Sequence, residues 1–320
     1  MRIISVTRHR SDNPLQVAQI EAPTTSPGEV LIDVSGAGVN RADILQRKGS
    51  YPSPPGWPAW PGLECAGIVS AVGDDVQGFA VGDHVCALVG GGAYAEQIAV
   101  PADLVLPVPR SLTLVESAAV MEAACTVWSN FETARLAPGE TLLIHGGSGG
   151  IGSFAIQLAK ARGVFVIATA RGAERTKRCL ELGADVAVDY TSGDFVEAAQ
   201  ASGGADVILD VVGAAYLERN LAALATAGRL VVIGLQRGAR AELDLGTLMT
   251  KRARIIGTTL RSRPHRERAA IVAEVGRGVW PLIPDKVRPL IHSTVPFAEA
   301  QRAHDLMESG EVFGKVVLVP

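Results

Sequence analysis

The sequence predicts an α/β protein in which a doubly wound parallel sheet follows a β-rich domain. Three observations predict this arrangement. The chain has 320 residues, which is long enough for two domains. Up to about residue 120, short apolar runs follow one another between Gly, Pro and Asp turns, as in a β barrel or sandwich. After that point, apolar runs alternate with helical segments, which is typical of a parallel sheet covered on both faces.

The β-rich part should contain four strands and one helix. The strands are expected at Val30–Val34, Gly67–Val72, His84–Leu88 and Gln97–Val100. The helix should begin near Asn40, a residue type that favours the N-cap. The segment Tyr51–Pro61 then holds too many prolines for a helix or a central strand. It is either a stiff surface loop or a pocket rim, where Tyr51, Trp57 and Trp60 would offer flat apolar faces.

The parallel-sheet part should contain six strands with helices between them. The strands are expected at Thr141–Ile144, Val164–Ala168, Val186–Val188, Val207–Val212, Leu230–Ile233 and Ile255–Thr258. The helices are expected at Val115–Phe131 and around residues 151–161, 174–182, 194–200, 214–225 and 245–251, with Gly183 as a C-cap.

The tail from about residue 262 is of mixed character. A helix near Glu267–Val275, a strand at His292–Val295, a helix around Ala298–Glu308 and a strand at Val316–Val319 are expected. These elements do not continue the alternation, so we predict that they return to the first domain. The predicted domains are therefore residues 1–120 with 262–320, and residues 121–261, with a cofactor cleft between them.

Composition and charge exclude several classes of function. The net charge of −3 lacks the basic footprint of a nucleic-acid-binding protein, so no nucleic-acid partner is expected. No apolar stretch reaches membrane-spanning length, and Met1–Val6 lacks a signal-peptide core, so no membrane partner is expected either. The cysteines are scattered, which favours reduced thiols and a cytoplasmic location. They are Cys65, Cys86, Cys125 and Cys179.

A glycine cluster joins the first parallel strand to the next helix. The segment Leu142–Gly152 reads as strand, tight turn and helix, and residues 147–152 match the spacing Gly-x-Gly-x-x-Gly. Glycines let a pyrophosphate approach the backbone, and a helix N-terminus favours an anion. An ordinary surface turn is the alternative, but the strand on each side favours dinucleotide binding. The predicted contacts are Ser148, Gly149, Gly150 and Ile151.

The end of the second parallel strand points to NADPH. An NAD-binding protein usually has Asp or Glu there for the ribose 2′-hydroxyl, whereas this chain has Ala170-Arg171-Gly172 with Lys177 downstream. Cations would bind an adenosine 2′-phosphate through charge-assisted hydrogen bonds. Alternatively these cations form a solvated helix face. The missing acid and the cations agree, so NADPH is the predicted cofactor.

Taken together, these motifs resemble the zinc-free quinone oxidoreductases of the medium-chain dehydrogenase/reductase superfamily, and within them the tumour-suppressor-inducible branch. The resemblance implies a GroES-like catalytic domain beside a Rossmann domain, and a small-molecule quinone or enone as substrate. The residues that carry it are Gly38–Asp43, Gln46 with Tyr51, Gly62–Gly67, His145–Gly152, Asp210–Gly213, Leu260–Arg263 and Phe313–Lys315.

The resemblance also implies roles for single residues. Lys177 and Tyr190 would contact the phosphate, and Lys315 a ribose or phosphate. Gly213, Gly234 and Leu235 would flank the nicotinamide, with Thr126 and Leu260 in the same neighbourhood. A homodimer would form through the sheet edge around Arg254–Leu260. Many quinone reductases have the turn pattern Ala-x-x-Gly-x-x-Gly, which this chain also matches, with Gly146 at the position of the alanine. Because the two patterns assign different glycines to the phosphate, which glycine contacts it stays open.

A metal site is not expected. Where zinc-dependent relatives place a Cys and a His, this chain has Asn40 and Leu63, neither of which binds zinc. The cysteine lobe for structural zinc is missing. The histidines have no ligand spacing, so each is expected at the surface or in packing. They are His9, His84, His145, His265, His292 and His304.

Without a metal, the hydride acceptor must delocalise negative charge itself, as a quinone or another conjugated carbonyl does. Tyr51 is the predicted catalytic hydrogen-bond donor to the carbonyl oxygen. Asn40 could act in the same way or serve only as the N-cap. Two other functions stay open: a zinc-free enoyl-thioester reductase, and a non-catalytic NADPH-binding protein of the crystallin-like or nucleic-acid-binding kind.

Overall fold

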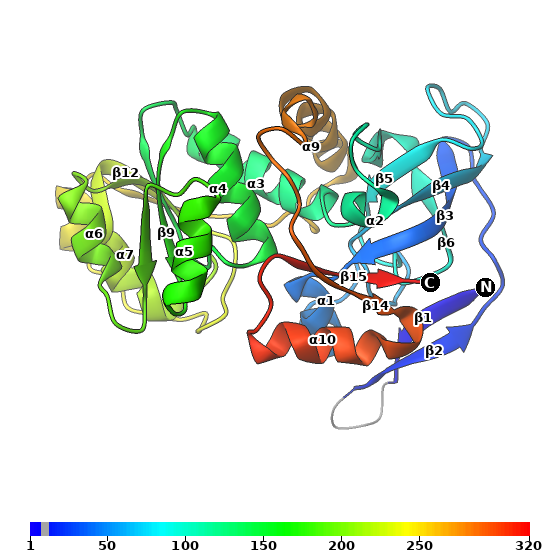
Figure 1. Cartoon of the computed structure of the whole chain (residues 1–320), viewed down its shortest axis with the longest axis horizontal. Coiled ribbons are helices and arrows are strands. Elements are labelled where there is room, and N and C mark those ends of the chain that lie inside the picture. Colours follow the sequence, from blue (N-terminus) through cyan, green and yellow to red (C-terminus); the bar gives the residue numbers. More distant parts are fainter. Residues whose placement is uncertain (8–12) are drawn as a thin grey trace. The chain divides into compact units, whose positions relative to one another are not determined.

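The computed structural model describes residues 1–7 and 13–320, and the chain folds as two compact units. The first unit comprises Met1–Cys125, Leu260–Pro284 and Pro289–Pro320, and the second comprises Thr126–Thr259 and Asp285–Arg288. In Figure 1 the first unit holds the blue and cyan strands and the orange and red tail, and the second unit is green to yellow. Within the described ranges, no helix has both the length and the apolar character that a bilayer crossing needs.

The second unit is built on a six-stranded parallel sheet. Along the sheet the strands are β10 (Val186–Asp189), β9 (Phe165–Ala170), β8 (Thr141–Ile144), β11 (Ala205–Asp210), β12 (Leu224–Val232) and β13 (Arg254–Gly257). Every neighbouring pair is parallel. The chain therefore moves outward from β8 in both directions, which is the doubly wound order of a dinucleotide-binding fold. The predicted parallel sheet is confirmed.

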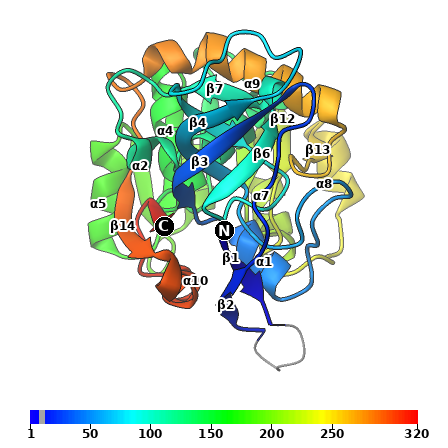
Figure 2. The same cartoon turned by 90° about the vertical axis from the view of Figure 1, so that its right-hand side faces the viewer.

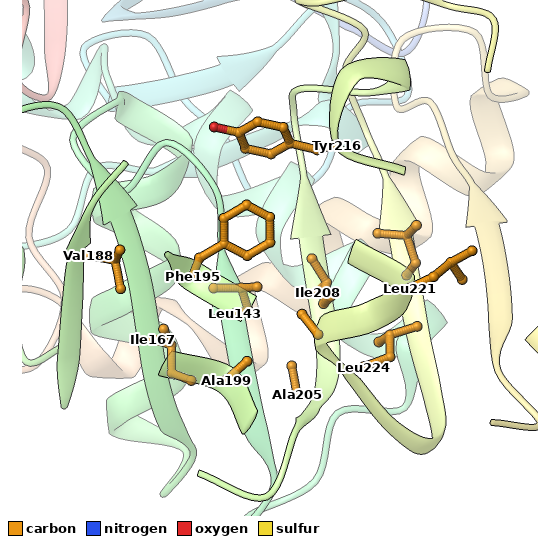
Figure 3. Close-up of a cluster of buried hydrophobic side chains, with 12 residues drawn as sticks. Leu143, Ile167, Val188, Phe195, Ala199, Ala205, Ile208, Tyr216, Leu221 and Leu224 are labelled. Carbon is orange, nitrogen blue, oxygen red and sulfur yellow. The ribbon is translucent and has the colours of Figure 1, made fainter. Parts of the chain in front are cut away.

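Helices of the second unit pack on the buried strands. They are α4 (Gly150–Ala161), α5 (Ala173–Glu181), α6 (Phe195–Ala201), the 3₁₀ turn η2 (Ala214–Tyr216), α7 (Leu217–Ala223) and α8 (Leu245–Thr250). Figure 3 shows one buried cluster, in which Phe195 and Leu221 of the helices meet Leu143 and Ile208 of the strands. These side chains are at most 2% exposed, so the apolar runs that predicted strands form the core.

The predicted single helix Val115–Phe131 is wrong. The structure has a short helix α2 (Leu114–Ser117), a turn at residues 118–120, and then α3 (Met121–Ala134), which runs from the first unit into the second. A Cβ on Gly38 would lie 2.6 Å from the carbonyl oxygen of Ala118, so the turn packs closely on this glycine. Tertiary packing therefore overrides the helical propensity of the Ala-rich segment.

The first unit has a mixed sheet. Its strands are β14 (Ile291–Pro296), β15 (Lys315–Val319), β3 (Glu29–Gly38), β4 (Glu64–Val72), β5 (His84–Leu88) and β7 (Val105–Pro107), and β6 (Gln97–Pro101) pairs with β3. β14 and β15 are parallel, and β15 joins β3 in antiparallel register. Strands from the tail are thus hydrogen-bonded to strands from the start of the chain.

Three short strands of the first unit were not predicted. They are β7 and the two-stranded ribbon of β1 (Arg2–Val6) and β2 (Leu15–Gln19), which Figure 2 shows near the N-terminus. Only the first residue of β2 is buried, and β7 has three residues. β2 and β7 therefore lack the apolar alternation on which a strand prediction depends.

The helices of the first unit are α1 (Arg41–Arg47), α9 (His265–Gly278) and α10 (Ala300–Ser309), together with the 3₁₀ turns η1 (Ala102–Leu104), η3 (Trp280–Leu282) and η4 (Phe297–Glu299). Asn40 is the N-cap of α1, as predicted. Its backbone N–H donates to the Asp43 carboxylate at 2.8 Å. Its side chain is thereby left for other partners.

Candidate active site

The predicted cofactor residues of the second unit lie at one edge of its sheet. The glycine turn follows β8, Arg171 follows β9, and Tyr190 follows β10. Gly213 follows β11, and Gly234 with Leu235 follows β12. Because neighbouring strands are parallel, all five loops leave the carboxyl edge of the sheet. In doubly wound folds a ligand binds at this edge, where the strand order reverses.

The glycines of the turn have different structural roles. A Cβ on Gly152 would lie 2.2 Å from the carbonyl oxygen of Gly146, so this position must be glycine for the helix to pack on the turn. A Cβ on Gly147 would lie 3.0 Å from Ala168 and from Cys179, so this position faces the core. A Cβ on Gly149 would lie 3.5 Å from its nearest atom, an ordinary van der Waals contact, and Gly149 is the N-cap of α4. A phosphate therefore has room at Gly149.

Cations lie just after β9 and in the middle of α5. Arg171 is exposed and has no ion-pair partner among the described residues. Lys177 is 77% exposed, with Glu181 at 3.9 Å. The carboxylate that does lie nearby, Asp189, accepts the backbone N–H of Gly172 at 2.9 Å and so holds the turn after Arg171. This part of the unit therefore offers exposed positive charge to an anion.

Two loops at the same edge are bonded to each other. The N–H of Ala214 donates to the carbonyl oxygen of Gly238 at 2.9 Å, and a Cβ on Gly213 would lie 2.7 Å from that oxygen. Gly213 has a φ of +81°, which favours glycine. The Asp210 carboxylate accepts the N–H groups of Val212 and Gly213, and burial raises its pKa to about 6. The backbone around Gly213 is thus fixed close to the sheet.

The first unit contains a buried polar cluster. The Lys315 ammonium donates to the Glu64 carboxylate and to the Asn40 amide oxygen, each at 2.5 Å. The amide nitrogen of Asn40 donates to Glu64 at 2.9 Å and to the Gly38 carbonyl at 3.2 Å. Lys315 is 5% exposed and Glu64 is fully buried. A Cβ on Gly38 would lie 2.3 Å from the Glu64 carboxylate, so the close approach requires glycine.

Two further carboxyl groups surround this cluster. The backbone N–H of Glu122 donates to the second Glu64 oxygen at 3.0 Å. Burial, and then the charge of Glu64, raise the pKa of Glu122 to about 8. Burial also raises the pKa of Asp43 to about 6, although Gly62 and Asn40 donate their N–H groups to its carboxylate. The cluster therefore combines a fixed cation with carboxyl groups that bind protons more readily than usual.

The proline-rich loop that carries Tyr51 is anchored on α1 and on a glycine triplet. The Trp60 indole N–H donates to the Gly92 carbonyl, and the Gly92 N–H donates to the Trp60 carbonyl, both at 2.9 Å. A Cβ on Gly90 would lie 2.6 Å from the Trp57 ring. A cavity of about 550 Å³ is lined by residues of α1 and of this loop, including Gln46, Ser53 and Trp57. The loop is therefore held in place and also borders a cavity.

The comparisons with known proteins agree with this architecture. Residues 26–110 match the family described as "Alcohol dehydrogenase GroES-like domain", and residues 150–275 match "Zinc-binding dehydrogenase". The quinone oxidoreductase of Rattus norvegicus is 32% identical, over 100% of this chain and 98% of its own length. The chain belongs to the quinone oxidoreductase family of the medium-chain dehydrogenase/reductase superfamily. The branch within that family stays a prediction.

Solved structures of quinone oxidoreductases have the same fold over the whole chain. That of Escherichia coli, solved in complex with NADPH, has a TM-score of 0.87 and 28% identity, with complete coverage of both chains. That of Thermus thermophilus, also described with NADPH, has a TM-score of 0.87 and 32% identity, again with complete coverage of both. The two units of this quinone oxidoreductase family member are thus the GroES-like and Rossmann folds that the sequence resemblance implied.

The structure gives two predicted site residues partners within the protein. The ammonium of Lys315, expected to contact a ribose or phosphate, is buried between Glu64 and Asn40. Both amide N–H groups of Asn40 already have protein acceptors, so a donor role toward substrate would break one of these bonds. Thr126 lies in α3, and Leu260 is 8% exposed at the start of the returning segment.

The histidines fall in different environments. His145 is 2% exposed and makes contacts with Asn220 at 2.7 Å and Thr169 at 3.2 Å, and burial lowers its pKa to about 4. His304 is fully buried beside the Tyr94 hydroxyl. His9 lies outside the described residues. In the rest of the chain, no group of three or more His, Cys, Asp or Glu side chains could hold a metal ion.

Several residues of this site were missed in the sequence. Glu64 and Glu122 lie in apolar surroundings, and a charged residue inside an apolar run was a signal that the sequence offered. No role was predicted for Arg261, which entered only within the segment Leu260–Arg263 of the resemblance. In the structure it is buried, with 5% of its surface exposed. The triplet Gly90–Gly92 was a signal for a close contact with the backbone. The residues that make this contact, Trp57 and Pro58, are distant in the chain, so the sequence did not identify them.

Proposed function

We propose that this protein is an NADPH-dependent quinone oxidoreductase that transfers hydride to quinones or other conjugated carbonyls without zinc. The observation that carries the proposal is the buried contact of the Lys315 ammonium with Asn40 and Glu64. Asn40 and Leu63 stand where zinc-dependent relatives have a Cys and a His, and a zinc ion beside Asn40 would meet a fixed positive charge. The relatives named above are quinone oxidoreductases, two of them solved with NADPH.

The carboxyl edge of the Rossmann unit fits NADPH. The pyrophosphate would lie against Ser148, Gly149, Gly150 and Ile151, where a Cβ on Gly149 would make no close contact with the protein. Arg171, Lys177 and Tyr190 would hold the 2′-phosphate. All three side chains are exposed, Arg171 just after β9, Lys177 within α5 and Tyr190 just after β10. Gly213, Gly234 and Leu235 would border the nicotinamide, with Thr126 and Leu260 nearby. NADPH, when bound, supplies the hydride.

The acceptor must stabilise the charge that arrives with the hydride. A quinone does so by becoming an aromatic hydroquinone anion, and an enone does so as an enolate. Tyr51 would donate its hydroxyl hydrogen bond to the oxygen that gains charge. Burial, and then the charge of Glu122, raise the pKa of the Tyr51 phenol, which keeps the hydroxyl protonated and able to donate. We assign Asn40 to holding Glu64 and Lys315 in place.

The decisive test follows NADPH absorbance against a panel of acceptors, with and without a chelator. A naphthoquinone and an enone should be reduced equally well in both conditions, and a simple aldehyde should not be reduced. A dependence on a tightly held divalent ion would contradict the zinc-free mechanism. Faster turnover of a crotonyl thioester than of every quinone would favour an enoyl-thioester reductase, and NADPH binding with no acceptor turned over would favour a non-catalytic binder.

Tyr51 is tested by its phenylalanine variant. Tyr51→Phe should lower kcat for the naphthoquinone by about 100-fold, the usual effect of losing one donor to a developing oxyanion. The dissociation constant for NADPH, followed by fluorescence, should stay within about twofold of wild type, because NADPH is expected at the sheet edge of the other unit. Unchanged turnover on the whole panel would remove Tyr51 from the mechanism.

We further propose a cytoplasmic homodimer that binds no nucleic acid. β13 is an outer strand of the Rossmann sheet, and such an edge is open to pairing with a second copy. Apolar side chains near this edge are exposed, including Ile255 at 38%, Leu245 at 61% and Met249 at 76%. The four cysteines are buried and free, which supports a reducing compartment. Light scattering on the purified protein tests the dimer, because a monomeric mass would contradict it.

A further inference from the structure

The guanidinium of Arg261 lies at the centre of the loop that carries Tyr51. One of its terminal nitrogens donates to the backbone carbonyl of Tyr51 at 3.1 Å. The other donates to the Gln46 amide oxygen at 2.6 Å and to the Ser53 hydroxyl at 2.9 Å. Its Nε donates to the Gly90 carbonyl at 2.6 Å. A single side chain therefore ties the loop to α1 and to the segment after β5.

The same guanidinium also faces the Tyr51 ring. Its central carbon lies 5.1 Å from the ring centroid, within the range of a cation–π contact. Arg261 is 5% exposed, so little water screens the interaction. Its positive charge acts against the burial and the Glu122 charge that raise the pKa of the Tyr51 phenol. Arg261 thus contacts the backbone of Tyr51 and affects the acidity of its side chain.

Lysine could not make this set of contacts. The planar guanidinium donates four hydrogen bonds in fixed directions, whereas an ammonium is a point charge with three donors. The segment after β5 leaves room for it, since a Cβ on Gly91 would lie 2.6 Å from the Ser53 hydroxyl and 3.3 Å from the guanidinium. Gln46, Ser53, Gly91 and Arg261 therefore form one interlocked group around the loop.

We propose that Arg261 is a positioning residue for Tyr51, fixing the loop that carries it and presenting a positive charge to its ring. This inference rests on the proposed function, in which Tyr51 donates a hydrogen bond to the substrate. It goes beyond that function because it assigns the position and the acidity of the donor to a residue that contacts neither substrate nor cofactor in the proposed mechanism.

The first test measures the Tyr51 phenol directly and needs no activity. Labelling with 3-fluorotyrosine lowers the pH range of the titration, fluorine NMR follows each phenol, and Tyr51→Phe identifies the signal. Arg261→Gln should raise the pKa of this phenol, because the opposing charge is lost, whereas Arg261→Lys should keep it close to wild type. Arg268→Gln is the matched control, since Arg268 is also 5% exposed but lies over the Trp57 ring at 5.2 Å. An unchanged Tyr51 pKa in Arg261→Gln would overturn the proposal.

The second test is a double-mutant cycle on quinone turnover. Arg261→Gln should lower kcat by about 10-fold or more, since small misplacements of catalytic groups are costly. In the Tyr51→Phe background the same substitution should have little further effect, because Arg261 acts through Tyr51. Arg261→Lys should recover part of the lost turnover. Activity in this variant would show that the chain still folds without the guanidinium. If the fold-decreases in kcat of the two single variants multiply in the double variant, the two residues act independently, and the proposal is overturned. If Tyr51→Phe alone keeps full turnover, Tyr51 is removed from the proposed mechanism while the quinone reductase activity stands, and the NMR titration still decides whether Arg261 affects the Tyr51 phenol.

Discussion

The glycine turn of the Rossmann unit and the glycine triplet that contacts the Tyr51 loop both allow a close contact, but with partners at different distances along the chain. In the turn, Gly152 makes room for Gly146, six residues earlier in the chain. In the triplet, Gly90 makes room for Trp57, which lies 33 positions before it and belongs to a loop without regular structure. Both are close approaches that a Cβ would prevent. Only the first is encoded within one short stretch of sequence.

This difference shows which kind of site can be predicted from a short stretch of sequence. A strand, a glycine turn and a helix are consecutive, so their spacing predicts a nucleotide site. The buried polar cluster and the Tyr51 loop depend on residues from α1, β4, α3 and β15, as well as Arg261 after β13, which only the fold brings together. The following substitutions break or sharpen this comparison, from the largest expected effect to the smallest.

The largest effect is expected in the buried ion pair of the GroES-like unit. Lys315→Met would leave the fully buried Glu64 carboxylate without its cation, which should lower the free energy of unfolding by about 3–5 kcal/mol. Glu64→Gln in the same chain should recover much of that loss, since no charge is then left unpaired. Chemical denaturation measures both. A single variant as stable as wild type would show that the pair contributes nothing.

The next effect is expected at the glycine turn. Gly152→Ala places a Cβ 2.2 Å from a backbone oxygen that cannot move without opening the turn, so stability should fall by about 1–3 kcal/mol and NADPH affinity should fall with it. Gly149→Ala is the control, because its Cβ has ordinary space. That variant should keep its melting temperature and lose NADPH affinity only if the pyrophosphate lies there. Thermal melts with and without NADPH separate the two outcomes.

A third effect concerns cofactor choice. Arg171→Glu reverses a charge at the end of β9 and should raise the KM for NADPH by about 100-fold while leaving that for NADH nearly unchanged, as expected for a lost charge-assisted contact. Arg266→Glu changes the net charge equally on the exposed start of α9 and serves as the control. Equal changes for both cofactors would mean that Arg171 does not read the 2′-phosphate.

The smallest effect is expected at the glycine triplet. Gly90→Ala places a Cβ 2.6 Å from the Trp57 ring, and this side chain can shift more easily than backbone can. We expect a decrease of about 10-fold in kcat/KM for quinone, corresponding to about 1.4 kcal/mol, with an unchanged NADPH dissociation constant. Steady-state kinetics and NADPH fluorescence measure the two. A loss of NADPH affinity instead would show that the loop also acts on the cofactor.

Much of the fold could be predicted because its signals are local. The strands β5 and β8 have the bounds that the sequence predicted, and the other parallel strands were placed within two residues except β12, which begins at Leu224 and not at the predicted Leu230. The break between α2 and α3 was not predicted, since the turn between them packs on Gly38 of β3, which is distant in the chain. The residues proposed to bind the cofactor could be named from the sequence because most of them directly follow a strand, and their role stays a prediction. The partners of Lys315 were not, because Glu64 lies 251 residues away in the chain.

The strand β15 has a consequence for the order in which the molecule is made. It lies between β14 and β3, so the sheet of the GroES-like unit is interrupted until these late residues have been synthesised. The Rossmann unit is almost entirely contiguous, from Thr126 to Thr259, and can close while the ribosome is still translating the tail. In a nascent chain that stops before Lys315, the Rossmann unit could be folded while Glu64 still lacked the cation beside which it is buried, so the GroES-like unit would be left incomplete.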